Sequence, residues 1–484
     1  MIPMTASEIA ALVGGRLADA DPAAVVRGAA TLDSRAVEPD GLFVALRGEH
    51  VDGHDFARSA IEAGAALVLA ARATGAPSVV VEDVSRALDT LAREVVARVE
   101  GVRVLALTGS QGKTSTKDLL AQVLAAEGPT VATAGNFNNE LGVPLTLLRT
   151  TADTRFLVVE MGARGVGHIA HLCSVARPDV AAVLNVGTAH LGEFGSRADI
   201  ARAKGEIVEG LPSDGTAVLN ADDDLVAPMA ARTAARVRRF GLAGERSAAD
   251  VRADDVLVDE LTLDELGRPR FVLVEGAARH AVELRTLGRH QAVNAAAAAA
   301  LARAVDVPLD RIAAALSAAS RASAWRMELH EVGGVVVLND AYNANPESMR
   351  AALRTLGDIG AGGAAPRRTI AVLGVMRELG EDSEAAHEEI GAHVVALGVD
   401  RLVVVGEEAA GIARGALAAG GATEVVVLDS RDAAQEWVRR HVRAPDVVLV
   451  KASRGAALEH VADALLRALT PSTADQSIDQ EAPR

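Results

Sequence analysis

Two stretches of the chain consist of short, continuous apolar runs that alternate with helix-like segments. In the first stretch, from about residue 103, the runs are VLALTG, TVATAG, FLVVEMG and VAAVLNVG. In the second stretch, after Ser323, the runs are GGVVVLND, TIAVLGVM, RLVVVG, EVVVLD and DVVLVKAS. Strands that are apolar on both faces belong in parallel sheets covered by helices. The pattern therefore predicts an α/β protein with two separate doubly wound sheets.

The N-terminal hundred residues show a mixed pattern. A strand-like run, GLFVAL (41–46), precedes HDFARSAIEAGAALVLA (54–70), which we interpret as helical. The segment is long enough for one compact α/β unit of about a hundred residues.

Between the two apolar stretches the pattern changes again. The alternation in LTLDELGRPRFVLVEG predicts antiparallel strands around a turn at residues 266–269. A helix is expected from about His290 to Val305, and Pro308 should open another.

Together these patterns divide the chain into residues 1–102, 103–322 and 323–469, followed by a polar, aperiodic tail at 470–484 without predicted structure. Three domains agree with a length of 484 residues.

Charge and composition exclude several classes of function. Lys and Arg number 49 against 65 Asp and Glu, a net charge of −16, which repels nucleic acid and anionic membrane surfaces. Aromatic residues are only 2%, too few for a surface that stacks nucleic-acid bases. The N-terminus lacks the basic region of a signal peptide, and the Ala-rich run from Ala295 ends at Arg303, short of the ~20 residues of a membrane span. One cysteine, Cys173, fits a reducing compartment, so we expect a cytoplasmic protein without membrane insertion.

A phosphate-binding loop is predicted where the strand VLALTG runs into SQGKTS and a helix. Backbone N–H groups at such a turn cradle phosphates, Lys113 reaches the β and γ oxygens, and Thr114 can bind Mg²⁺. The full motif has an earlier glycine where this chain has Leu107, so an ordinary glycine-rich turn is the alternative. The residues expected to bind ATP here are Gly109, Ser110, Gln111, Gly112, Lys113, Thr114 and Ser115.

Three further residues suit a metal site near this loop. Glu160 ends the strand FLVVE, at the edge where open α/β sheets bind ligands. His190 follows the strand VAAVLNVG, and Lys204 stands near the start of a helix. Taken singly, each has an ordinary explanation as a solvated strand end, a structural histidine or a surface lysine.

Two polar clusters suit a ligand rich in amides or hydroxyls. GNFNNELGV contains Asn138 and Asn139, which also make good turns and helix caps. NDAYNANPESM places Asp340 at a strand end and contains Tyr342, the only tyrosine, whose polar surroundings are poorly explained by core packing.

Taken in order, these motifs resemble the Mur ligase family, ATP-dependent enzymes that extend the peptide stem of the cell-wall precursor. The resemblance runs from Asp33 to about Arg454 and includes LGRHQAVN, WRMEL and KASRGAALEHV. YNANP and MRELGEDS are most similar to members that join D-alanyl-D-alanine to UDP-N-acetylmuramoyl-tripeptide through an acyl phosphate. The resemblance implies an N-terminal UDP-precursor domain, a central P-loop ATPase-like sheet and a C-terminal Rossmann-like ligase domain, in a monomer.

The resemblance also implies roles for individual residues. The family's shortened loop begins with TG, which accounts for Leu107. Lys113 and Thr114 would meet ATP phosphates and Mg²⁺, Glu160 and His190 would hold metal, and Lys204 would be carbamylated and bind a second Mg²⁺. Asn294 would contact adenine, Arg326 the γ-phosphate and Asp340 the ribose. The implied catalytic residues are Lys113, His190, Lys204 and Arg326. The implied substrate-binding residues are Ser34, Arg35, Asn138, Asn139, Tyr342, Asn343, Asn345, Ser453 and Arg454.

Two departures from the family pattern lie in the C-terminal part. Val375 stands where an acidic residue is usual, and Ala452 where glycine is common. Three alternatives stay open: the preceding ligase, which adds the third amino acid, a folylpolyglutamate synthetase, and a non-catalytic nucleotide-binding regulator. The preceding ligase lacks support because its diaminopimelate-type members carry a DNPR-like segment and this sequence contains none. A folylpolyglutamate synthetase is the weaker alternative because enzymes of that kind have no N-terminal precursor domain.

Overall fold

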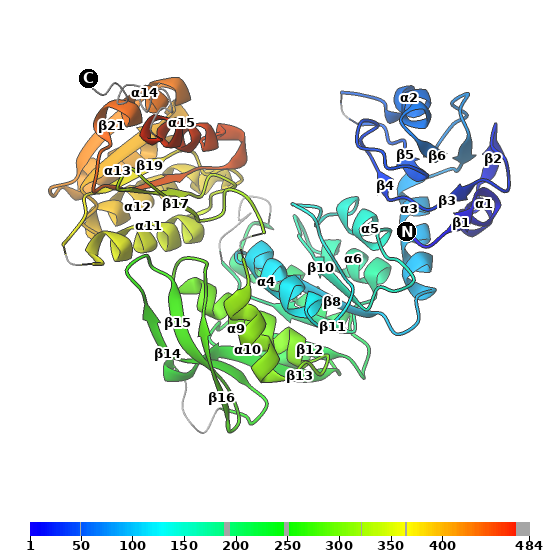
Figure 1. Ribbon diagram of the computed structural model, residues 1–484, viewed down its shortest axis with the longest axis horizontal. Coiled ribbons are helices and arrows are strands. Elements are labelled where there is room, and N and C mark those ends of the chain that lie inside the picture. The colour runs from blue at the N-terminus through cyan, green and yellow to red at the C-terminus, as the bar shows by residue number, and fades with distance from the viewer. Residues whose placement is uncertain (49, 188–193, 246–250, 321, 364, 471–484) are drawn as a thin grey trace, which may run out of the picture.

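The structure is a computed structural model that describes residues 1–48, 50–187, 194–245, 251–320, 322–363 and 365–470. Three α/β regions follow one another along the chain, and the N- and C-terminal regions lie on opposite sides of the central one (Figure 1). The α/β class expected from the apolar runs is confirmed. The tail assigned to 470–484 lies outside the described residues from position 471 onward.

The N-terminal region is built on a five-stranded sheet of order β2-β7-β6-β5-β4, parallel except for the β2–β7 pair. Its strands are β2 (Arg16–Ala18), β4 (Ala30–Thr31), β5 (Gly41–Val44), β6 (Ala65–Ala70) and β7 (Ser78–Val80), with a separate pair β1 (Met4–Thr5) and β3 (Val25–Val26). Its helices are α1 (Ala6–Val13), α2 (Ala57–Glu62) and α3 (Val84–Ala97), with the 3-10 turn η1 (Gly53–Phe56).

One expectation for this region is wrong. Residues 54–70 do not form a continuous helix, because α2 ends at Glu62 and the chain enters β6 at Ala65. Gly64, with φ of +116°, turns the chain in a conformation that side chains disfavour. The apolar run that follows is buried between β5 and β7, so sheet burial decides its conformation.

The central region is a nine-stranded sheet of order β16-β15-β14-β13-β12-β11-β8-β10-β9, in which only the β14–β15 and β15–β16 pairs are antiparallel. Its strands are β8 (Arg103–Thr108), β9 (Thr130–Ala132), β10 (Phe156–Glu160), β11 (Val180–Val183), β12 (Thr216–Asn220), β13 (Arg236–Leu242), β14 (Val256–Leu263), β15 (Pro269–Glu275) and β16 (Ala278–Glu283). Its helices are α4 (Lys113–Ala125), α5 (Gly142–Leu147), α6 (His168–Ala176), α8 (Arg197–Glu209), α9 (His290–Arg303) and α10 (Leu309–Ala318), with η2 (Ala227–Arg232) and η3 (Ala243–Glu245). The predicted parallel strands and the antiparallel turn near residue 266 are both confirmed.

The C-terminal region is a six-stranded sheet of order β17-β18-β22-β19-β20-β21, with β17 antiparallel at the edge. Its strands are β17 (Glu328–Val332), β18 (Val335–Asn339), β19 (Thr369–Leu373), β20 (Arg401–Val405), β21 (Glu424–Leu428) and β22 (Val447–Lys451). Its helices are α11 (Pro346–Ala361), α12 (Ser383–Ala396), α13 (Ala410–Ala419), α14 (Arg431–His441) and α15 (Glu459–Leu469), with η4 (Gly380–Asp382), η5 (Glu407–Ala409) and η6 (Arg454–Ala456).

The alanine-rich part of α9 determines how closely this helix packs in the central region. Every residue from Ala295 to Ala302 is fully buried, and α9 packs against α4 and the middle of the sheet. Such small side chains let helix and sheet approach closely, and this brings the first turns of α9 beside the start of α4.

The central and C-terminal regions meet through loops as well as through the linker between them. Leu287, just before α9, belongs to the hydrophobic core of the C-terminal region. The turn between β14 and β15 lies against α11, where a Cβ on Gly267 would approach Ile359 to 3.1 Å (Figure 1). The contact holds the far end of α11 while its first turn faces the phosphate loop.

Helix α4 also holds the start of the linker. The side-chain amide of Gln122 exchanges two 2.9 Å hydrogen bonds with the backbone of Ser320. The Ser323 hydroxyl donates to Asp118 Oδ2 at 2.6 Å. The helix that begins with the phosphate loop therefore also anchors the chain leading into the C-terminal region.

Among the helices of the described residues, none combines the length and the apolar character that crossing a bilayer requires.

The crossing of α12 and α13 supplies a stability test. A Cβ on Gly391 would lie 1.9 Å from the carbonyl oxygen of Ile412, which is backbone and cannot rotate away. We expect Gly391→Ala to destabilise the C-terminal region by about 1–3 kcal/mol, measured by urea unfolding. Gly357→Ala in α11 is the matched control, since its Cβ meets nothing within 4 Å, and it should be neutral or stabilising by about 0.5–1 kcal/mol. Equal stability of the two variants would contradict the close crossing.

Candidate active site

A cleft of about 640 Å³ lies between the start of α4 and the carboxyl ends of the C-terminal strands. Most residues singled out in the sequence line it, although they come from distant parts of the chain. These residues are Ser110, Gln111, Gly112, Lys113, Thr114, Ser115, Asn138, Asn139, Glu160, Lys204, Asn294, Arg326, Asp340, Tyr342, Asn343, Asn345, Ser453 and Arg454.

Three of the singled-out residues lie elsewhere, and the structure does not describe a fourth. Gly109 lies just behind the cleft, with its carbonyl oxygen turned to Lys113. Ser34 and Arg35 line a second cavity of the N-terminal region, which also includes Glu140 and Leu141 of the central region. His190 lies outside the described residues.

The phosphate loop folds around its own lysine. Lys113 Nζ donates to the carbonyl oxygen of Gly109 at 2.6 Å. Gly112 has φ of +78°, and a Cβ there would lie 2.5 Å from Asn294 Oδ1, so the loop needs glycine at this position. Burial lowers the pKa of Lys113, while the charge of Glu160 raises it and that of Arg326 lowers it. The loop thus carries a partly buried lysine close to charges from two other elements.

Glu160 at the end of β10 has the features of a metal ligand. The side chain is buried, and Asn138 donates to its Oε1 at 2.8 Å. Its Oε2 is buried without a hydrogen-bond partner among the described residues. A buried carboxylate oxygen without a partner is costly unless a cation binds it, so the residue fits a hard divalent ion such as Mg²⁺.

Lys204 is held in the cleft by the packing of α8. Two residues further along the helix, the buried Glu206 accepts hydrogen bonds from the backbone N–H of Gly167, at 2.6 Å, and of Ala170, at 3.0 Å. This carboxylate caps the start of α6 and fixes α8 against it. Burial lowers the pKa of Lys204 well below its ordinary value, and the charge of Lys113 lowers it further.

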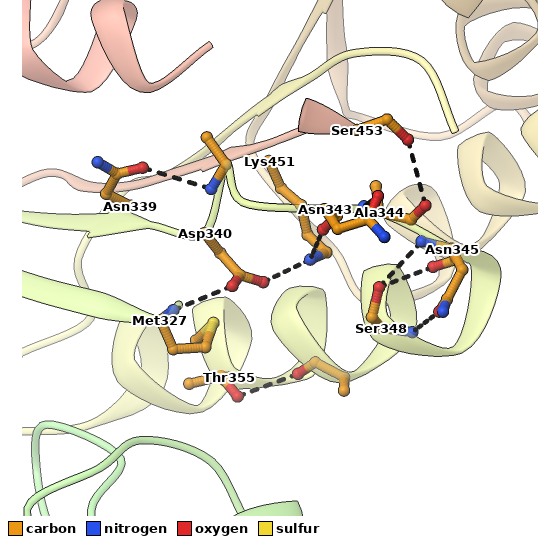
Figure 2. A network of polar contacts seen from close by, with 12 residues as sticks. Met327, Asn339, Asp340, Asn343, Ala344, Asn345, Ser348, Thr355, Lys451 and Ser453 are labelled. Carbon is orange, nitrogen blue, oxygen red and sulfur yellow. Dashed lines mark hydrogen bonds and ion pairs between the residues drawn. The ribbon is translucent and has the colours of Figure 1, made fainter. Parts of the chain in front are cut away.

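The C-terminal side of the cleft is built from Arg326 just before β17, from residues that follow β18, and from Lys451 at the end of β22. The Arg326 guanidinium lies 4.0 Å from the Tyr342 ring centre. Asp340 accepts from Lys451 Nζ at 2.5 Å, and the Asn345 side chain caps α11 (Figure 2). Cations and amides therefore face the phosphate loop from a second sheet.

Several cleft residues were not singled out from the sequence. Arg164, His168, His290, Gln291, Arg377, Glu378 and Lys451 also line the cleft. His290, Arg377, Glu378 and Lys451 stand inside motifs already quoted for the resemblance, so a closer examination of these motifs would have found them. Arg164 lies in the loop after β10 and His168 is the first residue of α6, where the sequence offers no comparable signal.

The two departures from the family pattern do not line this cleft among the described residues. The Val375 carbonyl accepts from the Ser453 N–H at 2.9 Å, and Ala452 is fully buried. Both act on the backbone that presents Ser453 rather than on a ligand.

A phosphate loop that opens toward a second α/β region with its own cations defines a nucleotide-dependent enzyme that joins substrates between two domains. Matches to known families specify it further: the Mur ligase family catalytic domain at residues 29–109, the Mur ligase middle domain at 107–302, and the Mur ligase glutamate ligase domain at 325–454. The chain belongs to the Mur ligase family.

Individual relatives cover almost the whole chain. A UDP-N-acetylmuramoyl-tripeptide--D-alanyl-D-alanine ligase of Mycobacterium bovis is 46% identical over 96% of this chain and 98% of its own. The enzyme of that name from Escherichia coli is 37% identical, covering 96% and 99%. A crystal structure of MurF from Acinetobacter baumannii has a TM-score of 0.84 at 31% identity, covering 96% and 99%. MurF ligase from Thermotoga maritima, solved in complex with ADP, has a TM-score of 0.76 at 30% identity, covering 91% and 98%.

The partly buried His290 makes the stability of the protein depend on pH. Burial lowers its pKa from 6.5 to about 4, against a raising effect of Asp340 and with a further lowering by Lys451. Between about pH 6.5 and pH 4 the unfolded chain therefore binds the proton and the folded chain does not, so this histidine makes stability fall as pH falls. We expect His290→Gln to lose less stability than wild type between pH 7 and pH 4.5 in urea unfolding. The exposed His460→Gln is the control, and an unchanged slope in His290→Gln would contradict the assignment.

Proposed function

We propose that this chain is an ATP-dependent ligase that joins D-alanyl-D-alanine to UDP-N-acetylmuramoyl-tripeptide. The observation that carries the proposal is the cleft in which Lys113 of the phosphate loop faces Arg326 and Asp340 of the C-terminal region. The relatives that match 96% of this chain bear the name of this reaction, and a solved relative binds ADP. The names of these relatives give no support to addition of the third amino acid instead.

The reaction proceeds in two transfers. The terminal carboxylate of the tripeptide attacks the γ-phosphorus of ATP, which forms an acyl phosphate and releases ADP. The amine of D-alanyl-D-alanine then attacks the acyl carbon, the C–O bond to phosphate breaks, and the amine loses a proton. The products are the amide and inorganic phosphate.

The phosphate loop and the C-terminal region divide the nucleotide between them. The phosphate loop from Gly109 to Ser115 holds the phosphates at the start of α4, and Lys113 turns from the Gly109 carbonyl to the β and γ oxygens. Arg326 meets the γ-phosphate from the other side and stabilises the charge that develops during transfer. Asn294 contacts the base and Asp340 the ribose. Residues 103–322 thus bind ATP, and residues 323–469 complete the site.

In this proposal Thr114, Glu160, His190 and a carbamylated Lys204 would hold Mg²⁺, which would supply positive charge to the phosphate oxygens. The free Oε2 of Glu160 supports one position. Carbamylation requires an uncharged amine, and it converts a buried cation into an oxygen ligand, which suits the position of Lys204 in the cleft.

The two remaining substrates enter from opposite ends. The UDP precursor binds residues 1–102 through the cavity that contains Ser34 and Arg35, and Asn138 and Asn139 meet its peptide. D-alanyl-D-alanine binds on the C-terminal side, where amides and cations suit its carboxylate and peptide group. The acceptor contacts are Tyr342, Asn343, Asn345, Ser453 and Arg454.

Phosphate release tests the function directly. We expect the release of inorganic phosphate to require ATP, a UDP-muramoyl-tripeptide and D-alanyl-D-alanine together. In Lys113→Ala the rate of this release should fall by roughly 10²- to 10³-fold. The buried Lys117→Met on the same helix is a control, because this ammonium bonds to Thr133 rather than to the cleft. Release with a single amino acid in place of the dipeptide would contradict the proposed substrate, and normal turnover in Lys113→Ala would contradict the role of the loop.

Chemical rescue tests the carbamate. Lys204→Ala should lose nearly all activity, and added short carboxylic acids should restore part of it by placing a carboxylate where the carbamate stood. Lys113→Ala serves as the control, since it should not respond to the same acids. ¹³C-labelled CO₂ should give a carbamate signal in wild type that is missing in Lys204→Ala. Full activity of Lys204→Ala would exclude the metal role of this residue.

A further inference from the structure

Arg326 lies between two residues in an unusual backbone conformation. Trp325 has φ of +54° and Met327 has φ of +46°, both in the left-handed region. Side chains with a Cβ rarely adopt this region because the Cβ crowds the following carbonyl oxygen. Such residues persist only where the surrounding structure holds them.

Hydrogen bonds from the C-terminal region hold both flanking residues. The Met327 N–H donates to Asp340 Oδ1 at 3.0 Å, and the Trp325 N–H donates to Glu328 Oε2 at 3.0 Å. The Trp325 carbonyl accepts from the Tyr342 N–H at 3.1 Å. The backbone at Arg326 is therefore set by the Asp340 carboxylate and the loop that carries Tyr342.

Lys451 joins these two supports. It is the last residue of β22 and only 2% exposed, and its Nζ donates to Asp340 Oδ2 at 2.5 Å and to the Asn343 carbonyl at 2.9 Å (Figure 2). One ammonium thus holds the carboxylate that binds Met327 and the loop whose Tyr342 ring stacks on the Arg326 guanidinium. Without this cation the carboxylate would remain buried and unpaired, and the loop carbonyl would lose its donor.

We propose that Lys451 is a positioning residue that orients Arg326 toward the phosphate loop through Asp340 and the Asn343 loop. The inference rests on the proposed function, in which Arg326 meets the γ-phosphate. Lys451 lines the cleft, but its ammonium is buried and already donates to two protein oxygens, so it acts through these contacts rather than on a substrate.

A double-mutant cycle tests this coupling. We expect Lys451→Met to lower kcat roughly 10- to 100-fold while the KM for UDP-N-acetylmuramoyl-tripeptide, which binds the N-terminal region in this proposal, changes less than about 3-fold. In an Arg326→Ala background the same substitution should lower kcat by less than about 3-fold, because the orientation it supports is no longer used. If the two effects multiply instead, Lys451 does not act through Arg326.

A second ion pair in the same sheet, with a buried aspartate and a partly exposed arginine, supplies the control. Arg368 and Asp446 pair at 2.6 Å just before β19 and β22 begin, at the end opposite to Lys451. Arg368→Met should lower the melting temperature, leave kcat near wild type, and combine independently with Arg326→Ala. Comparison of the two variants separates the effect of losing an ion pair from the effect of losing the orientation of Arg326.

Tryptophan fluorescence reports directly on the backbone segment 325–327, which carries Arg326. Trp325 and Trp437 are the only tryptophans, and Trp325 packs against the Arg454 guanidinium at 4.2 Å. In a Trp437→Phe background we expect Lys451→Met to shift the Trp325 emission and increase its quenching by iodide, and Arg368→Met to change neither. Unchanged emission in Lys451→Met would overturn the inference.

The outcomes separate the inference from the function. Wild-type kcat in Arg326→Ala, with the ligase reaction observed in both proteins, would remove Arg326 from the mechanism and overturn the catalytic part of the inference while leaving the proposed function intact. Absence of the ligase reaction in wild type would overturn the proposed function, and the emission of Trp325 would still test whether Lys451 holds the segment. Should Lys451→Met fail to fold, Lys451→Gln keeps amide donors without the charge, and the same cycle and emission measurements apply to it.

Discussion

The site has to hold ATP, a UDP-linked precursor and the carboxylate of a dipeptide on a chain with a net charge of −16. Long-range attraction cannot do this, so positive charge has to be concentrated where the substrates bind. The described cleft contains Lys113, Lys204 and Arg326 within one enclosed volume. Cations at such distances repel one another, and burial adds to the cost, as the lowered pKa values of Lys113 and Lys204 show. Bound phosphates and carboxylates relieve that repulsion, so the site is better matched to its ligands than to water.

Neither sheet can complete this cluster by itself. The carboxyl ends of the central strands supply the phosphate loop and Glu160, and those of the C-terminal strands supply Asp340 and Lys451. Ligands bind at these ends in open α/β sheets, and here two such ends face each other. Helix α4 connects them physically, because it begins at Lys113 and its side chains bind the linker at Ser320 and Ser323. Movement of the linker is therefore tied to the helix that carries the phosphate loop.

Much of the architecture follows from local pattern. Runs such as VLALTG and TIAVLGVM are apolar on both faces, and only a sheet with both faces covered buries them fully. The error at residues 54–70 shows the limit of this reasoning, since a short apolar run suits a buried strand as well as a helix. Glycine at 64 was the available signal. The edge strand β17 escaped prediction because ELHEV is only partly buried and its polar residues hide the alternation.

The sequence by itself determined the parallel sheets, the phosphate loop and the residue types gathered for phosphate and metal chemistry, because these depend on short segments and their spacing. Only the tertiary structure decided that Glu160 keeps a free buried oxygen and that Lys451 supports Arg326. The Asp340–Lys451 pair joins residues 111 positions apart, through the pairing of β18 with β22. No local pattern encodes that distance. It is set by strand order, and strand order depends on how the whole region buries its apolar faces.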